Sequence, residues 1–124
     1  MSHHNILSNL EGALMVFRFY PTDKLCAILP FFHSFGLTCT LWLPVAAGVP
    51  VCFVSNPLDA RAVGQTVHSE KATLLFATPT FLLHYFRRCE PEDFKTLRFI
   101  ITGAEKLKRE LIDEFEKKFG IRPC

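Results

Sequence analysis

The sequence lacks the short motifs that most often reveal a function. It contains neither a GxxxxGK[ST] loop nor a GxGxxG loop, the two glycine-rich patterns that bind nucleotide phosphates. Its 5 cysteines form no CxxC pair, which excludes the common zinc motifs. No Ser/His/Asp or Cys/His arrangement is indicated by spacing either. The sequence therefore gives no sign of an enzyme that uses one of these two glycine-rich loops, a common zinc motif, or a Ser/His/Asp or Cys/His arrangement.

Long hydrophobic runs and one-sided charge are also missing. The longest apolar stretch, residues 41–54, contains Pro44, Gly48 and Pro50 and is too short to span a bilayer as a helix. The net charge is only +2, and basic residues near the C-terminus alternate with acidic ones, as on a solvated helix face. We therefore expect no transmembrane segment and no nucleic-acid partner.

Cellular location is indicated only indirectly. The polar start, Ser2 to Asn5, does not resemble a signal peptide. Cys26, Cys39 and Cys52 lie inside apolar runs, as small core residues do. Unpaired, buried cysteines are typical of a reducing compartment, so we expect a cytoplasmic protein.

Apolar residues, by contrast, are abundant. They make up 49% of the 124 residues and include 13 Phe. A small domain has much surface to cover with polar groups, so this fraction is high for a free-standing domain. Two explanations stay open: an apolar but ordinary α/β domain, or a domain whose surface partly packs on further chain.

Helical and strand patterns alternate along the chain. Short apolar strands are predicted over residues 24–29, 51–54, 72–77 and 97–101, and helices over 2–19, 37–47, 59–70, 78–88 and 107–119. This order predicts an α/β fold with a mostly parallel sheet of about four strands flanked by helices. Ligands of such sheets bind beyond the carboxyl ends of the strands, so we expect a site in the loops 30–36, 55–59, 78–81 and 102–106.

Two of these loops contain residues suited to binding. His33 follows a buried strand, where it could hydrogen-bond a phosphate or carboxylate, or simply cap its own helix. Residues 102–104 (TGA) are small, which leaves room for a flat ring and for free backbone N–H groups at a helix start, or simply makes a tight turn. Taken singly, neither loop decides between binding and local structure.

Taken in order, four segments resemble those of adenylate-forming ligases, a family of acyl-CoA synthetases, luciferases and peptide-synthetase adenylation domains. Residues 2–6 (SHHNI) resemble the segment after the family's phosphate loop, and residues 29–36 (LPFFHSFG) its aromatic-histidine motif. Residues 77–80 (ATPT) resemble the turn at its acyl pocket, and residues 101–107 (ITGAEKL) its adenine-contacting segment. The resemblance extends over essentially the whole chain and points towards long-chain acyl-CoA or acyl-carrier-protein synthetases.

The resemblance implies an activity and roles for particular residues. The parent enzyme would use ATP and Mg²⁺ to convert a carboxylic acid, a fatty acid in particular, into an acyl-adenylate, and would pass the acyl group to a thiol of CoA or acyl carrier protein. His33 would lie beside the reacting carboxylate and α-phosphate, and Phe35 would line the acyl pocket. The adenine would lie along Gly103, Ala104 and Glu105. Cys39 and Thr80 would lie near the acyl group, and no metal ligand is expected in this chain.

The resemblance also implies missing parts. The family's phosphate loop would precede Met1, and its Tyr-Gly-x-Thr-Glu segment, ribose-binding Asp and C-terminal domain with a catalytic Lys would follow Cys124. We therefore expect residues 1–124 to be an incomplete internal part of an AMP-binding domain, inactive without the rest of the chain. The alternatives are a non-catalytic binding module and a truncated relic without activity. A response regulator, which shares this β/α order, would need acidic residues where the first strand ends in PFFH.

Overall fold

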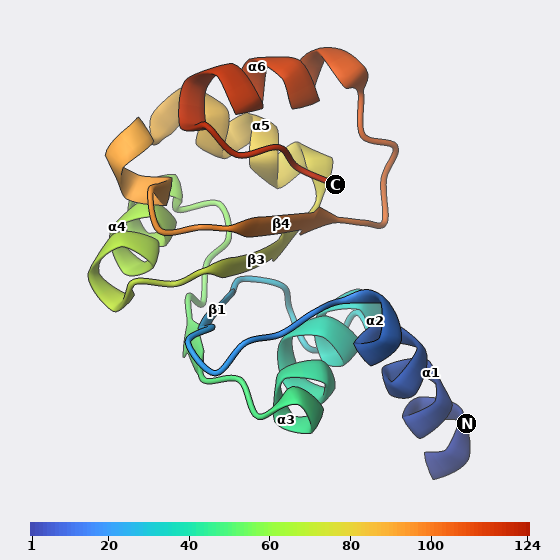
Figure 1. The fold of residues 1–124 in the computed structure, drawn as a ribbon. Helices are drawn as coiled ribbons and strands as arrows, with labels where there is room; N and C mark the ends of the chain where they lie inside the picture. The colour runs from blue at the N-terminus through green and yellow to red at the C-terminus, as the bar shows by residue number, and fades with distance from the viewer.

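Four parallel strands form one sheet at the centre of the structure, a computed structural model that describes residues 1–124 (Figure 1). The sheet order is β2-β1-β3-β4. The strands are β1 (Leu25–Ala27), β2 (Val51–Phe53), β3 (Leu74–Ala77) and β4 (Phe99–Thr102). Leu25 lies opposite both Val51 and Leu74, and Leu74 lies opposite Phe99. The parallel α/β fold predicted from the sequence is confirmed.

Burial follows the position of each strand in this order. Every residue of the central strands β1 and β3 is buried, which explains their nearly continuous apolar sequences. The outer strands β2 and β4 are largely half-buried. Beyond β4, the Cys124 N–H donates to the Ile100 carbonyl at 3.0 Å, and the Cys124 carbonyl accepts from the Thr102 N–H at 2.7 Å. The chain end thus lies beside β4 in the manner of a further parallel strand.

Helices cover both faces of the sheet (Figure 1). One face carries α4 (Ala60–Glu70), α5 (Pro79–Arg88) and α6 (Arg109–Phe119), and the short 3₁₀ turn η2 (Pro91–Phe94) follows α5. The other face carries α1 (His3–Val16) and a helix built from α2 (Ser34–Gly36), η1 (Leu37–Trp42) and α3 (Leu43–Ala47). None of these helices combines the length and hydrophobicity needed to cross a bilayer.

The helix ends follow from local sequence. Ser2 caps α1 in a reciprocal pair with Asn5, Asp59 caps α4, and Thr78 caps α5 just before Pro79. At the other end, Gly48 ends α3 with a φ of 67°, a left-handed conformation that glycine adopts without strain. These signals explain why α1, α4 and α5 begin, and α3 ends, close to where the sequence predicts.

The helix after β1 differs from the prediction. Residues 34–36, predicted as part of a loop, form its first turn, and the following six residues of η1 are a π-helix. Pro44 has no N–H to donate, and the Thr40 hydroxyl donates to the Gly36 carbonyl at 2.6 Å. Both features interrupt the regular α-helical hydrogen-bond ladder, and π-helical turns are frequent at functional sites.

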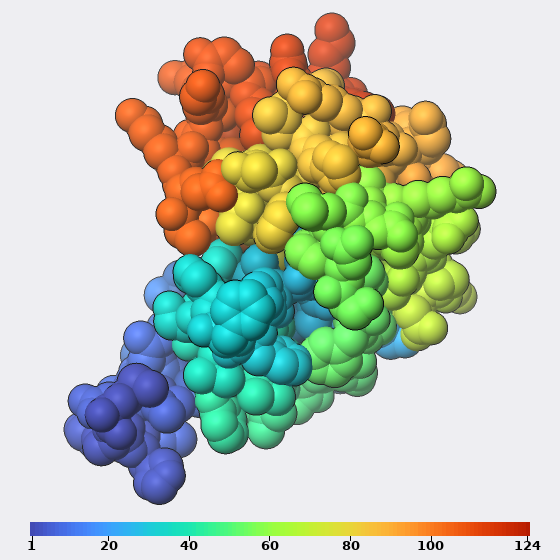
Figure 2. Space-filling model, turned by 180° about the vertical axis from the view of Figure 1, so that it is seen from behind, coloured from blue at the N-terminus to red at the C-terminus, as the bar shows by residue number.

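Several large apolar side chains remain on the surface. Phe32 is 93% exposed, and Met15 and Val16 at the end of α1 are 86% and 76% exposed. Phe53 on the outer strand β2 is also exposed and meets Phe31 edge to face. In the space-filling view, α1 projects away from the rest of the molecule (Figure 2). Part of the high apolar content of the sequence therefore lies on the surface and not in the core.

Candidate functional site

The loops at the carboxyl ends of three strands surround a cavity of about 330 Å³. The first loop follows β1, the second joins β3 to α5, and the third follows β4. The cavity is lined by Leu29, Pro30, His33, Phe35, Gly36, Thr78, Phe81, Ala104 and Glu105. Four of the residues selected from the sequence are among them: His33, Phe35, Ala104 and Glu105. The position agrees with the general rule for parallel sheets.

His33 both caps its helix and faces the cavity. Its Nδ1 accepts a hydrogen bond from the Phe35 N–H at 3.2 Å, so His33 is the N-cap of α2. In a neutral imidazole this contact makes Nδ1 the acceptor and places the proton on Nε2. The ring is exposed, so its Nε2–H is available to an anionic oxygen in the cavity. The two roles considered from the sequence are therefore compatible.

Gly36 is required by a close backbone contact. A Cβ at this position would lie 2.0 Å from the carbonyl oxygen of Pro30 and 2.7 Å from its carbonyl carbon. Because those atoms belong to the main chain, no side-chain rotation could relieve the clash. The contact packs the start of α2 against the backbone that follows β1.

Phe35 connects the first loop to the third. Its ring meets Phe76 of β3 edge to face, with centroids 6.5 Å apart. The same ring lies so close to Gly103 that an added Cβ there would be 2.9 Å from its Cζ atom. The sequence selected both residues separately, and the structure brings them into contact. Cys39, on η1, lines an adjoining hollow with His33, Phe35 and Ala104, and burial raises the pKa of its thiol to about 11.

The loop after β4 decides between the two interpretations considered for residues 102–104. It offers no free N–H groups at a helix start, because α6 begins only at Arg109. The Gly103 N–H donates to the Ala77 carbonyl at 3.2 Å, and the Thr102 N–H is also bonded. These groups are therefore occupied within the fold. Ala104 has a φ of 66°, a left-handed conformation that is unfavourable for a residue with a side chain.

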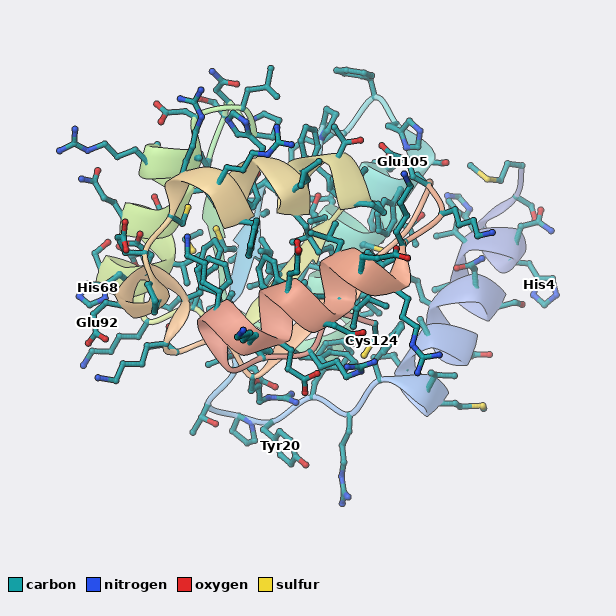
Figure 3. All side chains as sticks on the ribbon, turned by 90° about the horizontal axis from the view of Figure 1, so that it is seen from above. His4, Tyr20, His68, Glu92, Glu105 and Cys124 are labelled. Atoms are coloured by element: carbon teal, nitrogen blue, oxygen red, sulfur yellow. The ribbon has the colours of Figure 1, made fainter.

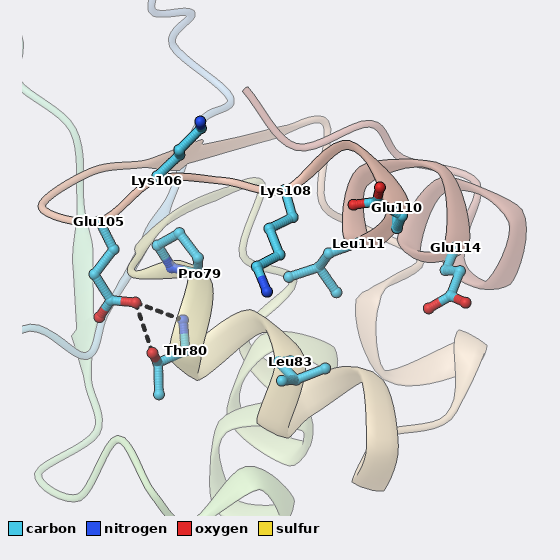
Figure 4. A pocket seen from close by; sticks show the side chains of 9 residues that line it. All are labelled: Pro79, Thr80, Leu83, Glu105, Lys106, Lys108, Glu110, Leu111 and Glu114. Atoms are coloured by element: carbon cyan, nitrogen blue, oxygen red, sulfur yellow. Dashed lines mark hydrogen bonds between the residues drawn. The ribbon is translucent and has the colours of Figure 1, made fainter.

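Glu105 and Thr80 form a contact that the sequence did not reveal. The Glu105 carboxylate accepts hydrogen bonds from the Thr80 hydroxyl at 2.6 Å and from the Thr80 N–H at 3.3 Å (Figure 4). Thr80 thus lies beside the cavity with its hydroxyl already engaged. No sequence pattern predicts this pair, because its members come from different β-α connections.

A second hollow, of about 370 Å³, lies between α5 and α6 (Figure 4). Lys108 points into it, whereas Lys106 points away. Its lining mixes charges of both signs: Pro79, Thr80, Leu83, Glu105, Lys106, Lys108, Glu110, Leu111 and Glu114. No group of three or more His, Cys, Asp or Glu side chains in the chain is arranged to hold a metal ion.

The other histidines have no place in the cavity. His68 Nδ1 bonds to the Glu92 carbonyl at 3.1 Å, and His84 Nε2 bonds to the Leu58 carbonyl at 2.7 Å. His68 lies at the left edge of the view in Figure 3, well away from Glu105. Their contacts are structural, so His33 is the candidate for chemistry.

Four lining residues had been given no individual role from the sequence: Leu29, Pro30, Thr78 and Phe81. All four lie in or beside the carboxyl-end loops that the sequence selected. Thr78 belongs to the turn that the resemblance places at the acyl pocket, and the Phe81 N–H donates to the Thr78 hydroxyl. The sequence therefore predicts which loops form the cavity, but it does not predict the direction of each side chain in them.

Comparisons with known proteins agree over the whole chain. The family described as AMP-binding enzyme matches residues 1–124. An acyl-CoA ligase of Ajellomyces capsulatus is 30% identical over 98% of this chain and 22% of its own length. An acyl-CoA ligase of Aspergillus fumigatus is 31% identical over the same shares. The chain thus spans about a fifth of the length of the curated relatives that it matches.

Solved structures show the same arrangement. The crystal structure of apo MatB from Rhodopseudomonas palustris superposes with a TM-score of 0.88 and 26% identity, over 99% of this chain and 24% of that one. The ATP-bound form of the same protein gives a TM-score of 0.87 at 25% identity, over 100% of this chain and 25% of that one. The chain belongs to the AMP-binding enzyme family, the adenylate-forming ligases that activate acyl groups.

Proposed function

We propose that the protein, at its full natural length, activates a carboxylic acid with ATP. The acid's carboxylate oxygen attacks the α-phosphorus of ATP, which forms an acyl-adenylate and releases pyrophosphate. A thiol of CoA or of an acyl carrier protein then attacks the acyl carbon and releases AMP. The observation that supports this proposal most is that His33, Ala104 and Glu105 line one cavity in a chain of the AMP-binding family.

His33 would orient the reacting groups. With Nδ1 engaged by the Phe35 N–H, its Nε2–H is the free donor, suited to the carboxylate or to an α-phosphate oxygen. Charge develops on the α-phosphate during the transfer, and a fixed donor that meets this charge lowers the barrier. The role we propose for His33 is therefore positioning and electrostatic stabilisation.

The remaining roles divide the cavity between the two substrates. Phe35, with Cys39 and Thr80 nearby, would shape the side that receives the acid. Gly103, Ala104 and Glu105 would lie along the adenine and contact it mainly with their backbone. The Gly103 N–H would not take part, because it is already bonded within the fold. We assign magnesium binding to no residue of this chain, because the resemblance places the family's magnesium-binding Glu after Cys124. Residues 1–124 would form part of one AMP-binding domain.

The acid is a fatty acid in this proposal. Relatives of similar identity are named for different acids: a long-chain-fatty-acid–CoA ligase of Bacillus subtilis at 28% and a p-hydroxybenzoic acid–AMP ligase of Mycobacterium tuberculosis at 27%. The apolar side chains of Leu29, Phe35 and Phe81 around the cavity favour an aliphatic or aromatic acid over a highly polar one.

The location that we propose for the protein is the cytoplasm. The 5 unpaired cysteines of the chain favour a reducing compartment.

The test is ATP–pyrophosphate exchange with a panel of short, medium and long fatty acids and one aromatic acid. We expect acid-dependent exchange by the protein at its full natural length, strongest with a fatty acid. We expect none from residues 1–124 alone, since they contain no glycine-rich phosphate loop. Strongest exchange with the aromatic acid would reject the fatty-acid assignment. The absence of exchange with every acid would reject adenylation and favour a binding module.

A further inference from the structure

Glu105 lines the cavity, but its carboxylate is bonded to a helix start. Its carboxylate takes hydrogen bonds from both the N–H and the hydroxyl of Thr80, which lies in the first turn of α5 (Figure 4). The first N–H groups of a helix have no partner within the helix. Thr78 satisfies one of them, the Phe81 N–H, from the adjoining chain. Glu105 satisfies a second one from a position 25 residues away in sequence.

The contact is electrostatically favourable. A carboxylate at a helix N-terminus meets the positive end of the helix dipole. The hydroxyl-to-carboxylate distance of 2.6 Å is short, as is typical of hydrogen bonds to a charged acceptor. Glu105 takes part in none of the five salt bridges of the structure, so no lysine or arginine competes for its carboxylate. Thr80 is therefore the partner that fixes the Glu105 side chain.

The contact holds a strained backbone in place. Ala104, the preceding residue, has its φ at 66°, which a residue with a Cβ adopts only when its surroundings impose it. On one side of Ala104, the Gly103 N–H is bonded to the Ala77 carbonyl at the end of β3. On the other side, Glu105 is bonded to Thr80. Both bonds tie the loop after β4 to the turn between β3 and α5.

We propose that Glu105 is a positioning residue that acts through Thr80. By capping α5 it holds Gly103 and Ala104 in the conformation that receives the adenine, and it fixes this side of the cavity relative to the acid side. The proposal rests on the adenylation proposed above. It changes the expected role of Glu105, whose carboxylate then acts on the nucleotide indirectly. Loss of the contact lets Ala104 leave its left-handed conformation.

A double-mutant cycle tests this at full natural length. Glu105→Ala, Thr80→Val and the double variant are compared by pyrophosphate exchange. We expect each single variant to raise the KM for ATP by about three- to tenfold, as for loss of one hydrogen bond at an exposed site, with a much smaller change in kcat. The double variant should be no worse than Glu105→Ala, because that substitution already removes both hydrogen bonds, whereas Thr80→Val removes only the one from the hydroxyl.

Conservative variants separate positioning from general damage. Thr80→Ser keeps the hydroxyl and should retain a KM for ATP near that of the wild type. Glu105→Gln keeps an acceptor oxygen but loses the charge, so its KM should lie between those of the wild type and Glu105→Ala. Glu114→Gln is the matched control, because Glu114 and Glu105 both line the hollow between α5 and α6, and Glu114 has no hydrogen-bond partner there. Effects that simply add in the double variant would overturn the proposal, and so would an unchanged KM for ATP in Glu105→Ala.

Amide hydrogen exchange tests the positioning without any catalysis. We expect faster exchange of the Gly103 amide in Glu105→Ala and in Thr80→Val, and no change in Glu114→Gln. Unchanged protection in the first two variants would reject the proposal even if the protein adenylates acids. If the wild type shows no exchange of pyrophosphate, adenylation fails instead, and the amide measurement still decides whether Glu105 holds the loop.

Discussion

Replacing Asp23 by Asn should destabilise the sheet at the end opposite the cavity. Asp23 lies just before β1 and is only 3% exposed. Its carboxylate accepts hydrogen bonds from the Tyr20 N–H at 2.8 Å, the Thr73 hydroxyl at 2.7 Å and the Arg98 Nε at 2.8 Å, and from the Arg98 Nη2. Thr73 and Arg98 directly precede β3 and β4, so one carboxylate joins the starts of three strands.

The magnitude follows from the pKa of this carboxyl. The hydrogen bond from Arg98 is the main cause that lowers the pKa of Asp23 from 3.8 to about 2. That shift corresponds to about 2.5 kcal/mol, at about 1.4 kcal/mol per pH unit. The Arg98 side chain is 36% exposed, so solvent screening reduces the figure to about 2 kcal/mol. Asp23→Asn also leaves the guanidinium without its ion-pair partner, and we expect a total loss of about 2 to 4 kcal/mol.

The pH dependence has a defined sign. The folded-state pKa is depressed, so the stabilisation is fully present above the unfolded-state pKa and is lost as the pH falls from about 4 towards 2. Urea unfolding followed by circular dichroism, at neutral pH and at pH values across this window, measures both effects. The control is Glu70→Gln, which removes an exposed pair with Lys24 and should cost less than about 1 kcal/mol. An Asp23→Asn variant as stable as this control would refute the reasoning.

Two further predictions concern glycines in and beside the cavity. Gly36→Ala should lower the free energy of unfolding by more than about 3 kcal/mol or prevent folding, because the added Cβ would overlap the Pro30 carbonyl. Gly12→Ala, on an open surface of α1, should instead raise the free energy of unfolding by about 0.5 to 1 kcal/mol. Equal melting temperatures for these two variants would contradict the close contact. Gly103→Ala should push the Phe35 ring aside and lower acid-dependent pyrophosphate exchange, and Phe35→Leu in the same chain should restore part of it; no recovery would show that the ring contact is not the cause.

The fold could be predicted from the sequence because its signals are local. The apolar runs of β1 and β3 and the caps at Ser2, Asp59 and Thr78 depend on neighbouring residues only. The helix over residues 34–47 was predicted too short. Its N-cap is a histidine, which is an uncommon cap, and Gly36 is a poor helix former that sequence reasoning assigned to a loop.

The site was predictable in position but not in detail. Parallel topology places the loops of His33 and Gly103 at one edge of the sheet, so their convergence followed from the strand order. The contact of Phe35 with Gly103 and that of Glu105 with Thr80 depend on side-chain directions over long sequence separations. No periodicity or motif encodes those directions, so only the folded structure shows them.

The most direct test of the account is pyrophosphate exchange by a His33→Asn variant of the protein at its full natural length. Asn is a good helix N-cap, so this variant keeps the capping of α2, while its short side chain cannot present a donor where the His33 Nε2–H lies. We expect kcat to fall by about 10²- to 10³-fold, as for loss of a fixed transition-state donor, with the melting temperature unchanged. His4→Ala, at an exposed position in α1, should behave as the wild type. Normal exchange by His33→Asn would contradict the proposed role of His33, and with it the site described here.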